Sequence, residues 1–398
     1  YGRWFNRRRL ASLLAFPAIW VLGEWLRSWL FTGFPWLYLG YGHLETPLAG
    51  WAPIGGIYAL GFACAFSAAT LVQCATAGPK HLSSRAALLG CIAIWAAGWG
   101  LQQLPWTAPK GDPIKVGMVQ ANIPQELKWN PLFREPTLTR FRTLSETLWD
   151  NDWVIWPEAA IPILYHQASD ILTEMHERAT ATDTAFVTGI LYDNARDRQY
   201  YNSVVGLGAA TGIYHKRRLV PFGEYVPMEP WLRGLISFFD LPTSIISKGP
   251  AGQRPLQMQK HALAPSICYE VVYPDLVAAG AVDTDVLLTI SNDAWFGASI
   301  GPLQHMQMAQ MRALETGRYL IRATNSGVSG IVDPQGRLIL KSEQFVQQTL
   351  QGEVRAMVGS TPFMRWGSWP MVILSSLLLV VVVVSSRPHT ATGAPQNP

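Results

Sequence analysis

Three residues with complementary chemistry follow short apolar segments of the chain. Glu158 follows "WVIWP", Lys216 follows "IYH" and Cys268 follows "LAPSI". A thiol that attacks a carbonyl needs a base to remove its proton and a positive group to hold the charge that develops on the oxygen. Open α/β sheets carry their active sites at the carboxyl ends of strands. An acid, an amine and a thiol at such positions therefore favour covalent catalysis by a cysteine.

Cys268 taken alone is more typical of a buried filler than of a nucleophile. It is the only cysteine after residue 91, so its own domain offers no disulfide partner. No CxxC motif or Cys/His spacing lies near it, so we expect neither a metal nor a cofactor. The joint presence of Glu158 and Lys216 shifts the interpretation toward a nucleophile. The remaining cysteines lie in apolar segments, where a small thiol packs easily: Cys64, Cys74 and Cys91.

Alternating strand and helix patterns surround these residues. Short β-rich runs bounded by turn residues predict strands at 114–120, 152–157, 185–191, 201–208, 263–268 and 285–290. Amphipathic patterns predict helices at 168–182 and 301–318, and a Pro-Gln-Gly turn predicts a hairpin at 327–340. This pattern indicates a layered α/β domain.

The rest of the chain is unusually apolar. Hydrophobic residues make up 49% of the sequence and charged residues 15%, against about 25% charged in typical soluble proteins. A bilayer span needs about 20 mostly apolar residues, and four segments fit: 10–31, 55–78, 86–104 and 371–386. The formal net charge of +4 comes without a dense basic stripe, so we expect no nucleic-acid partner.

Basic residues in the short loops predict the orientation of these spans. The segment 1–9 holds four arginines and the loop 78–85 holds two basic residues, so both should be cytoplasmic. The loop 32–52 holds no Lys or Arg and should lie outside. We therefore predict a membrane domain, an external catalytic domain, a C-terminal membrane helix and a disordered tail at 1–110, 111–362, 363–387 and 388–398, respectively.

Three motifs resemble the nitrilase (carbon–nitrogen hydrolase) superfamily. "WPEAAIP" with Glu158, "HKRRLVPFGEYVP" with Lys216 and "ICYEVVYPD" with Cys268 are similar, in order, to its Glu–Lys–Cys signatures. "SNDAWFGASIGPLQHMQMAQMRALETGR", "EWLRSWLFTGFPWLYLGYG" and "VQANIPQELKWNP" resemble one branch, the apolipoprotein N-acyltransferases. The resemblance implies membrane α-helical segments plus an α/β nitrilase-like αββα sandwich domain. The branch has more spans than four, so we expect this chain to be N-terminally truncated.

The resemblance also implies a reaction. Cys268 would attack an acyl ester of a membrane phospholipid and form a thioester. The N-terminal amine of a diacylglyceryl-cysteine lipoprotein would then take the acyl chain, in a ping-pong transfer. Glu158 would be the general base and Lys216 the group that stabilises the oxyanion.

Further residues match the branch motifs. Glu224 is expected to orient Lys216 or to share in proton transfer, and Tyr269 and Glu270 to support the nucleophile. Trp129 resembles a loop tryptophan near the acyl-chain entrance, although a core or interface aromatic explains it nearly as well. The segment 227–242, "PMEPWLRGLISFFDLP", is interpreted as a membrane-facing lid or as an ordinary amphipathic surface helix.

Two other functions stay open from the sequence. A membrane-tethered amidase or nitrilase-type hydrolase would share the thioester step but use water as the acceptor. A non-catalytic scaffold would not need Glu158, Lys216 and Cys268 together. The resemblance implies a bacterial inner-membrane, multi-pass protein with its catalytic domain on the periplasmic side. We expect a monomer, because a lipid portal and a large protein substrate both need clear access. Its partners would be a phospholipid donor, a diacylated apolipoprotein acceptor and the bilayer.

Overall fold

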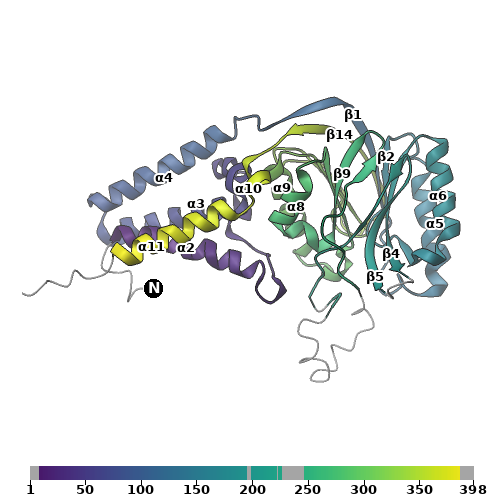
Figure 1. Cartoon of the computed structure of the whole chain (residues 1–398), viewed down its shortest axis with the longest axis horizontal. Helices are drawn as coiled ribbons and strands as arrows, with labels where there is room; N and C mark the ends of the chain where they lie inside the picture. The colour runs from purple at the N-terminus through teal and green to yellow at the C-terminus, as the bar shows by residue number, and fades with distance from the viewer. Residues whose placement is uncertain (1–8, 195–198, 222, 226–245, 386–398) are drawn as a thin grey trace, which may run out of the picture.

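A bundle of membrane-type helices lies at one end of the molecule and a layered α/β domain at the other (Figure 1). The computed structural model describes residues 9–194, 199–221, 223–225 and 246–385. Two expectations, the lid at 227–242 and the tail at 388–398, lie outside the described residues.

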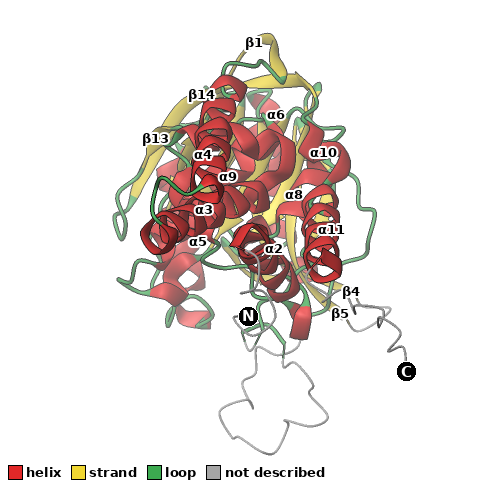
Figure 2. Ribbon diagram, turned by 90° about the vertical axis from the view of Figure 1, so that its left-hand side faces the viewer, coloured by secondary structure: helices red, strands yellow, loops and turns green. Residues whose placement is uncertain are grey.

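All four predicted spans contain a long helix, namely α2 (Arg9–Arg27), α3 (Ala52–Ala77), α4 (Leu82–Leu101) and α11 (Trp369–Ser385). Within the described residues, two helical segments, Pro47–Ala77 and Leu82–Leu101, are long and apolar enough to cross a membrane. Helix α11 is apolar but has 17 residues. The helices expose large apolar side chains, as lipid-facing surfaces do: Leu71, Leu89, Ile92, Trp99, Leu377 and Val381. Figure 2 views the molecule from this end, with the helices in front of the sheets.

The described strands form two seven-stranded mixed sheets. The first has the order β14-β1-β2-β4-β5-β7, with β3 beside β4. Its strands are β1 (Thr107–Gln120), β2 (Trp153–Ile155), β3 (Ile161–Leu164), β4 (Ala185–Asn194), β5 (Gln199–Gly208), β7 (Ile213–His215) and β14 (Gln348–Gly359). The second has the order β13-β12-β11-β10-β9-β8-β6. Its strands are β6 (Ala210–Thr211), β8 (Leu256–Met258), β9 (His261–Ile267), β10 (Val286–Ser291), β11 (Leu320–Thr324), β12 (Gly330–Val332) and β13 (Leu338–Lys341).

The sheets are the two inner layers of an αββα sandwich. Apolar side chains from both sheets fill the space between them, including Val116, Ile155, Val187, Ile267 and Ile290. Helices α5 (Arg134–Ser145) and α6 (Ser169–Ala181) cover the outer face of the first sheet. Helices α8 (Pro274–Ala281) and α9 (Gly301–Thr316) cover that of the second. This layering confirms the predicted fold class.

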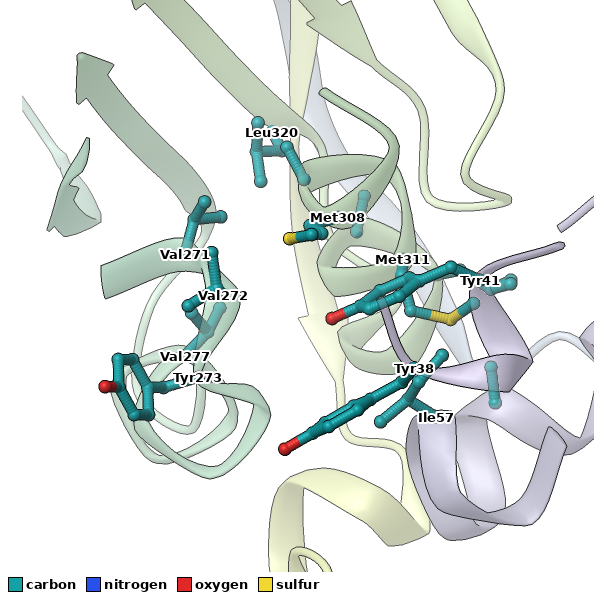
Figure 3. Close-up of a cluster of buried hydrophobic side chains, with 14 of the residues drawn as sticks. Tyr38, Tyr41, Ile57, Val271, Val272, Tyr273, Val277, Met308, Met311 and Leu320 are labelled. Atoms are coloured by element: carbon teal, nitrogen blue, oxygen red, sulfur yellow. The ribbon is translucent and has the colours of Figure 1, made fainter. Parts of the chain in front are cut away.

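The layers of the sandwich and the membrane helices share one hydrophobic core. Tyr38, Tyr41 and Ile57 from the N-terminal region pack in one cluster with Val272 and Met311 (Figure 3). The 3-10 turn η7 (Cys268–Val272) and the helix α10 (Pro362–Trp366), which leads into α11, also contribute to this junction. The turn that begins with Cys268 therefore shares a hydrophobic core with the membrane helices.

The six predicted strands, the two predicted helices and the hairpin are all present. The periodicity missed β14 and the first half of β1, which pair antiparallel from Thr107↔Gly359 to Gln120↔Gln348. The first half of β1 is largely exposed and polar, so it lacks the apolar alternation on which strand prediction depends.

Candidate active site

Glu158, Lys216 and Cys268 each follow a strand and meet in one buried cluster. Glu158 follows β2, Lys216 follows β7 and Cys268 follows β9. Lys216 Nζ lies 3.6 Å from Glu158 Oε1, and the charges of both residues act on the Cys268 thiol. The side chains are buried, with 7%, 1% and 9% of each residue exposed, respectively. Residues far apart in the sequence are thus brought into one water-poor site.

The Glu158 carboxylate is held by hydrogen bonds from two other segments of the chain. Its Oε1 accepts a hydrogen bond from Asn202 Nδ2 at 2.7 Å, and its Oε2 accepts one from the Asn292 backbone N–H at 2.7 Å. Gly189 on β4 allows this placement, because a Cβ there would lie 2.5 Å from the Ala159 nitrogen. The carboxylate is therefore oriented before any substrate binds.

Lys216 lies between two carboxylates. Its Nζ donates to Glu224 Oε1 at 2.8 Å, and Glu224 is itself held by the Val220 backbone N–H and by Asn202 Nδ2. Burial lowers the pKa of Lys216, but the adjacent carboxylates of Glu224 and Glu158 outweigh burial, so its pKa is raised overall. Lys216 therefore stays a cation across the physiological range, and Glu224 holds its ammonium group in place.

Cys268 begins a tight turn with strained backbone geometry. Its φ of 50° lies in the left-handed region, which non-glycine residues seldom adopt. Burial, together with the charge of Glu158, raises the pKa of the Cys268 thiol to about 12, against the opposing effect of Lys216. The resting site therefore holds a neutral thiol, and attack on a carbonyl needs a base beside it. The Glu158 carboxylate is near enough for its charge to act on this thiol.

A buried polar network lies behind the turn that begins with Cys268. His305 Nε2 lies 3.1 Å from the Cys268 carbonyl oxygen and donates to it, while His305 Nδ1 lies 3.0 Å from Asp293 Oδ1. Arg322 Nη2 donates to Asp293 Oδ2 at 2.8 Å. Burial and the Arg322 charge lower the pKa of His305, against the opposing charge and hydrogen bond of Asp293. His305 thus contacts the backbone of Cys268, which does not make the pair a Cys–His dyad.

Tyr269 and Glu270 tie the turn to its surroundings. The Tyr269 hydroxyl donates to the Gly33 carbonyl at 3.3 Å, which links the segment of Cys268 to the loop after α2. The Glu270 carboxylate accepts hydrogen bonds from the backbone N–H groups of Ile267, Arg217 and Arg218. Glu270 therefore joins the turn of Cys268 to the segment that follows Lys216.

Trp129 and Lys128 are neighbours with opposite exposure. Trp129 has 44% of its surface exposed, so it is not a core aromatic. Lys128 is buried, and its Nζ donates to the Glu158 backbone carbonyl at 3.0 Å. Burial lowers the pKa of Lys128 to about 8, against the opposing charges of Glu158 and Cys268.

Several of these residues escaped the sequence analysis. They are the polar residues whose hydrogen bonds hold the site together, including His305 in its contact with the Cys268 carbonyl: Lys128, Asn202, Asn292, Asp293, His305 and Arg322. The polar run "SND" at the end of the strand 286–291 is a local signal that could have indicated Asn292 and Asp293 as site residues. Within the part of the chain that the structure describes, no group of three or more His, Cys, Asp or Glu side chains has the arrangement of a metal site.

Known families match both parts of this chain. The carbon-nitrogen hydrolase model matches residues 115–363, and the apolipoprotein N-acyltransferase N-terminal domain model matches residues 1–70. The apolipoprotein N-acyltransferase of Azotobacter vinelandii is 48% identical over 99% of this chain and 78% of its own length. The apolipoprotein N-acyltransferase of Pseudomonas paraeruginosa is 47% identical over 95% of this chain and 75% of its own length.

Among solved structures, yeast (Saccharomyces cerevisiae) Nit3, a nitrilase-superfamily member, aligns with a TM-score of 0.48 at 16% identity, over 62% of this chain and 93% of its own. The two family models and the identities of nearly half over almost the whole chain agree on one assignment. The chain belongs to the apolipoprotein N-acyltransferase family, within the carbon–nitrogen hydrolases, and is an N-acyltransferase.

Proposed function

We propose that this enzyme transfers an acyl chain from a membrane phospholipid, through a thioester on Cys268, to the N-terminal amine of a diacylglyceryl-cysteine lipoprotein. The observation that carries the proposal is the Glu158–Lys216 pair, 3.6 Å apart, whose charges both act on the Cys268 thiol. The names of the relatives support an apolipoprotein acceptor. We also propose the domain division given above, a monomer, and an inner-membrane location with a periplasmic catalytic domain.

The first half-reaction loads the cysteine. Glu158 takes the thiol proton as the sulfur attacks the ester carbonyl carbon, which gives a tetrahedral oxyanion beside the Lys216 ammonium. Collapse of this intermediate breaks the bond between carbon and the ester oxygen. Glu158 returns the proton to that oxygen, so a lysophospholipid leaves and the acyl chain stays on Cys268 as a thioester.

The second half-reaction transfers the chain to the amine. The neutral α-amine of the diacylglyceryl-cysteine attacks the thioester carbonyl, and Glu158 takes the proton that the nitrogen loses. A second oxyanion forms beside Lys216 and collapses with cleavage of the carbon–sulfur bond. The sulfur leaves as a thiolate and regains a proton from Glu158, which restores the resting thiol and releases an amide.

The membrane setting supports a lipid donor. Each acyl CH₂ that enters water costs about 0.8 kcal/mol, so the site must open close to the bilayer. The nucleophile turn packs in the same core as Tyr38 and Ile57 of the membrane-helix region. A hydrolase for water-soluble amides has no need of this junction, which favours the acyltransferase over the hydrolase.

The experiment is a thioester trap with the full chain. The enzyme is mixed with a phospholipid labelled in its acyl chain, quenched in acid and examined for label on the peptide that contains Cys268. We expect label on the wild type and none on Cys268→Ala. Addition of a diacylated lipopeptide should then move the label to the peptide amine. Transfer of the label to water instead would support the hydrolase.

A further inference from the structure

An exposed apolar loop lies beside the nucleophile turn. The loop after α2, which includes the short helix η1 (Leu30–Thr32), leaves Phe31 74% and Phe34 55% exposed. The Phe34 ring stacks near Tyr269, with 6.5 Å between ring centroids. In Figure 1 this is the dark purple turn that extends from α2 toward the sandwich. Exposed aromatic side chains at such a junction are typical of a surface that meets lipid.

An arginine borders this surface on the catalytic side. The Arg218 side chain is exposed, and its guanidinium lies over the Tyr273 ring at 5.0 Å from the centroid. The Tyr273 hydroxyl donates to the Gly33 carbonyl of the apolar loop at 3.4 Å. Among the described residues, no carboxylate forms an ion pair with Arg218. Within the described residues, its guanidinium donors thus lie beside the apolar loop without a carboxylate partner.

The position of Arg218 is linked to that of the nucleophile. The Glu270 carboxylate accepts a hydrogen bond from the Arg218 backbone N–H at 3.1 Å and another from the Ile267 N–H at 2.8 Å. Ile267 immediately precedes Cys268. One buried carboxylate therefore fixes the backbone of Arg218 relative to the backbone that immediately precedes Cys268.

We propose that Arg218 binds the phosphodiester of the phospholipid donor and so directs the donor's ester carbonyl toward Cys268. This inference rests on the function proposed above. A guanidinium matches the geometry of a phosphate and binds it with two hydrogen bonds. The acyl ester and the phosphate of a glycerophospholipid are only a few covalent bonds apart. An anchored phosphate therefore limits where the ester carbonyl lies, while the acyl chain follows the apolar loop.

The test compares two acyl donors that differ in phosphate. Acylation of Cys268 is followed in a single turnover with phosphatidylglycerol and with a p-nitrophenyl ester of the same fatty acid, both in neutral detergent micelles. Loss of a hydrogen-bonded ionic contact costs roughly ten- to a hundredfold in rate. We expect Arg218→Ala to slow acylation by the phospholipid by that factor and acylation by the p-nitrophenyl ester less than about twofold. Arg218→Lys should fall between the two.

Arg134→Ala is the matched control, because Arg134 is an exposed arginine at the start of α5, on the outer layer of the sandwich. It should leave both rates unchanged. Equal slowing of both donors by Arg218→Ala would assign the residue to support of the turn and overturn the inference, as would unchanged rates. Inorganic phosphate should not compete, and competition that Arg218→Ala removes would indicate a free-phosphate site instead. A wild type that accepts the p-nitrophenyl ester but no phospholipid would overturn the proposed function itself.

Discussion

Lys128 Nζ donates a 3.0 Å hydrogen bond to the backbone carbonyl of Glu158, so a second buried cation lies beside the candidate base. Glu158 and Glu224 together carry one more negative charge than Lys216 neutralises. A negative surplus opposes formation of a thiolate at Cys268. The Lys128 ammonium offsets this surplus.

Lys128→Met should therefore slow alkylation of Cys268 by iodoacetamide at pH 7 by roughly tenfold, which corresponds to about one pKa unit. Because the pKa of Lys128 is lowered to about 8, its charge is lost as the pH rises through that value, and the difference from wild type should shrink above pH 9. Lys128→Arg should keep the charge, and Lys115→Met, at an exposed position on β1, serves as the control. An alkylation profile that Lys128→Met leaves unmoved would refute the role.

Lys128→Met should also change the pH dependence of folding stability. A folded-state pKa below the usual value of Lys means that burial of the charged form opposes folding below about pH 8. That cost decreases between pH 8 and the ordinary lysine pKa of about 10.4. We expect the melting temperature of Lys128→Met at pH 7 to be no lower than that of wild type. A large drop would mean that the Glu158 hydrogen bond outweighs the burial of the charge.

Glu158→Gln should stop acylation while the fold persists. The amide oxygen keeps an acceptor for Asn202 or for the Asn292 N–H, but an amide does not take the thiol proton. General-base catalysis contributes about a hundred- to ten-thousandfold, so thioester formation should fall by at least about a hundredfold in stopped-flow assays. Glu126→Gln, at an exposed site in the 124–130 loop, should retain the wild-type rate. Acylation within a few-fold of wild type in Glu158→Gln would remove Glu158 from the mechanism.

Arg322→Met tests the network behind the turn. Removal of one partner of a buried ion pair costs about 3–5 kcal/mol, and Arg322 and Asp293 are both buried. Arg322 and His305 hold the pKa of Asp293 below its usual range, against burial. This stabilisation is full above the unfolded pKa of about 3.9 and is lost as the pH falls below it, so the deficit of the variant should shrink in acid.

Arg337→Met is the comparison for that prediction, because the Arg337 side chain is exposed although its partner Asp333 is buried, and its loss should cost less than about 1 kcal/mol. Thermal unfolding of both variants between pH 3 and pH 7 provides the measurement. Equal losses in the two variants, or a deficit independent of pH, would contradict the assignment.

Arg312 and Glu315 couple the sandwich to the membrane helices. Glu315 Oε1 accepts hydrogen bonds from the Ile57 backbone N–H at 2.8 Å and from Arg312 Nη2 at 3.0 Å, and Arg312 Nη1 donates to the Val272 carbonyl at 3.3 Å. Arg312→Met and Glu315→Gln should each destabilise by about 3 kcal/mol or more, because each leaves a buried charge unpaired. The double variant should lose less than the sum. Strictly additive losses in melting experiments would show that the pair is not coupled.

Local patterns in the sequence determined the elements and three site residues. Apolar runs bounded by turns marked the strands whose ends carry Glu158 and Cys268, because the side-chain period and turn chemistry are local properties. The short strand β7 before Lys216 was not among the predicted strands. The long uncharged stretches marked the membrane-type helices for the same reason.

Only the tertiary structure decided what surrounds the thiol. His305 and Arg322 read as ordinary residues of a helix and a strand, and their role arises from contacts with Cys268 and Asp293 across separate elements. Tyr269 meets Gly33 across 236 positions of the chain. Such contacts form when whole layers pack and buried polar groups must find partners wherever the fold brings them. No local periodicity encodes that pairing.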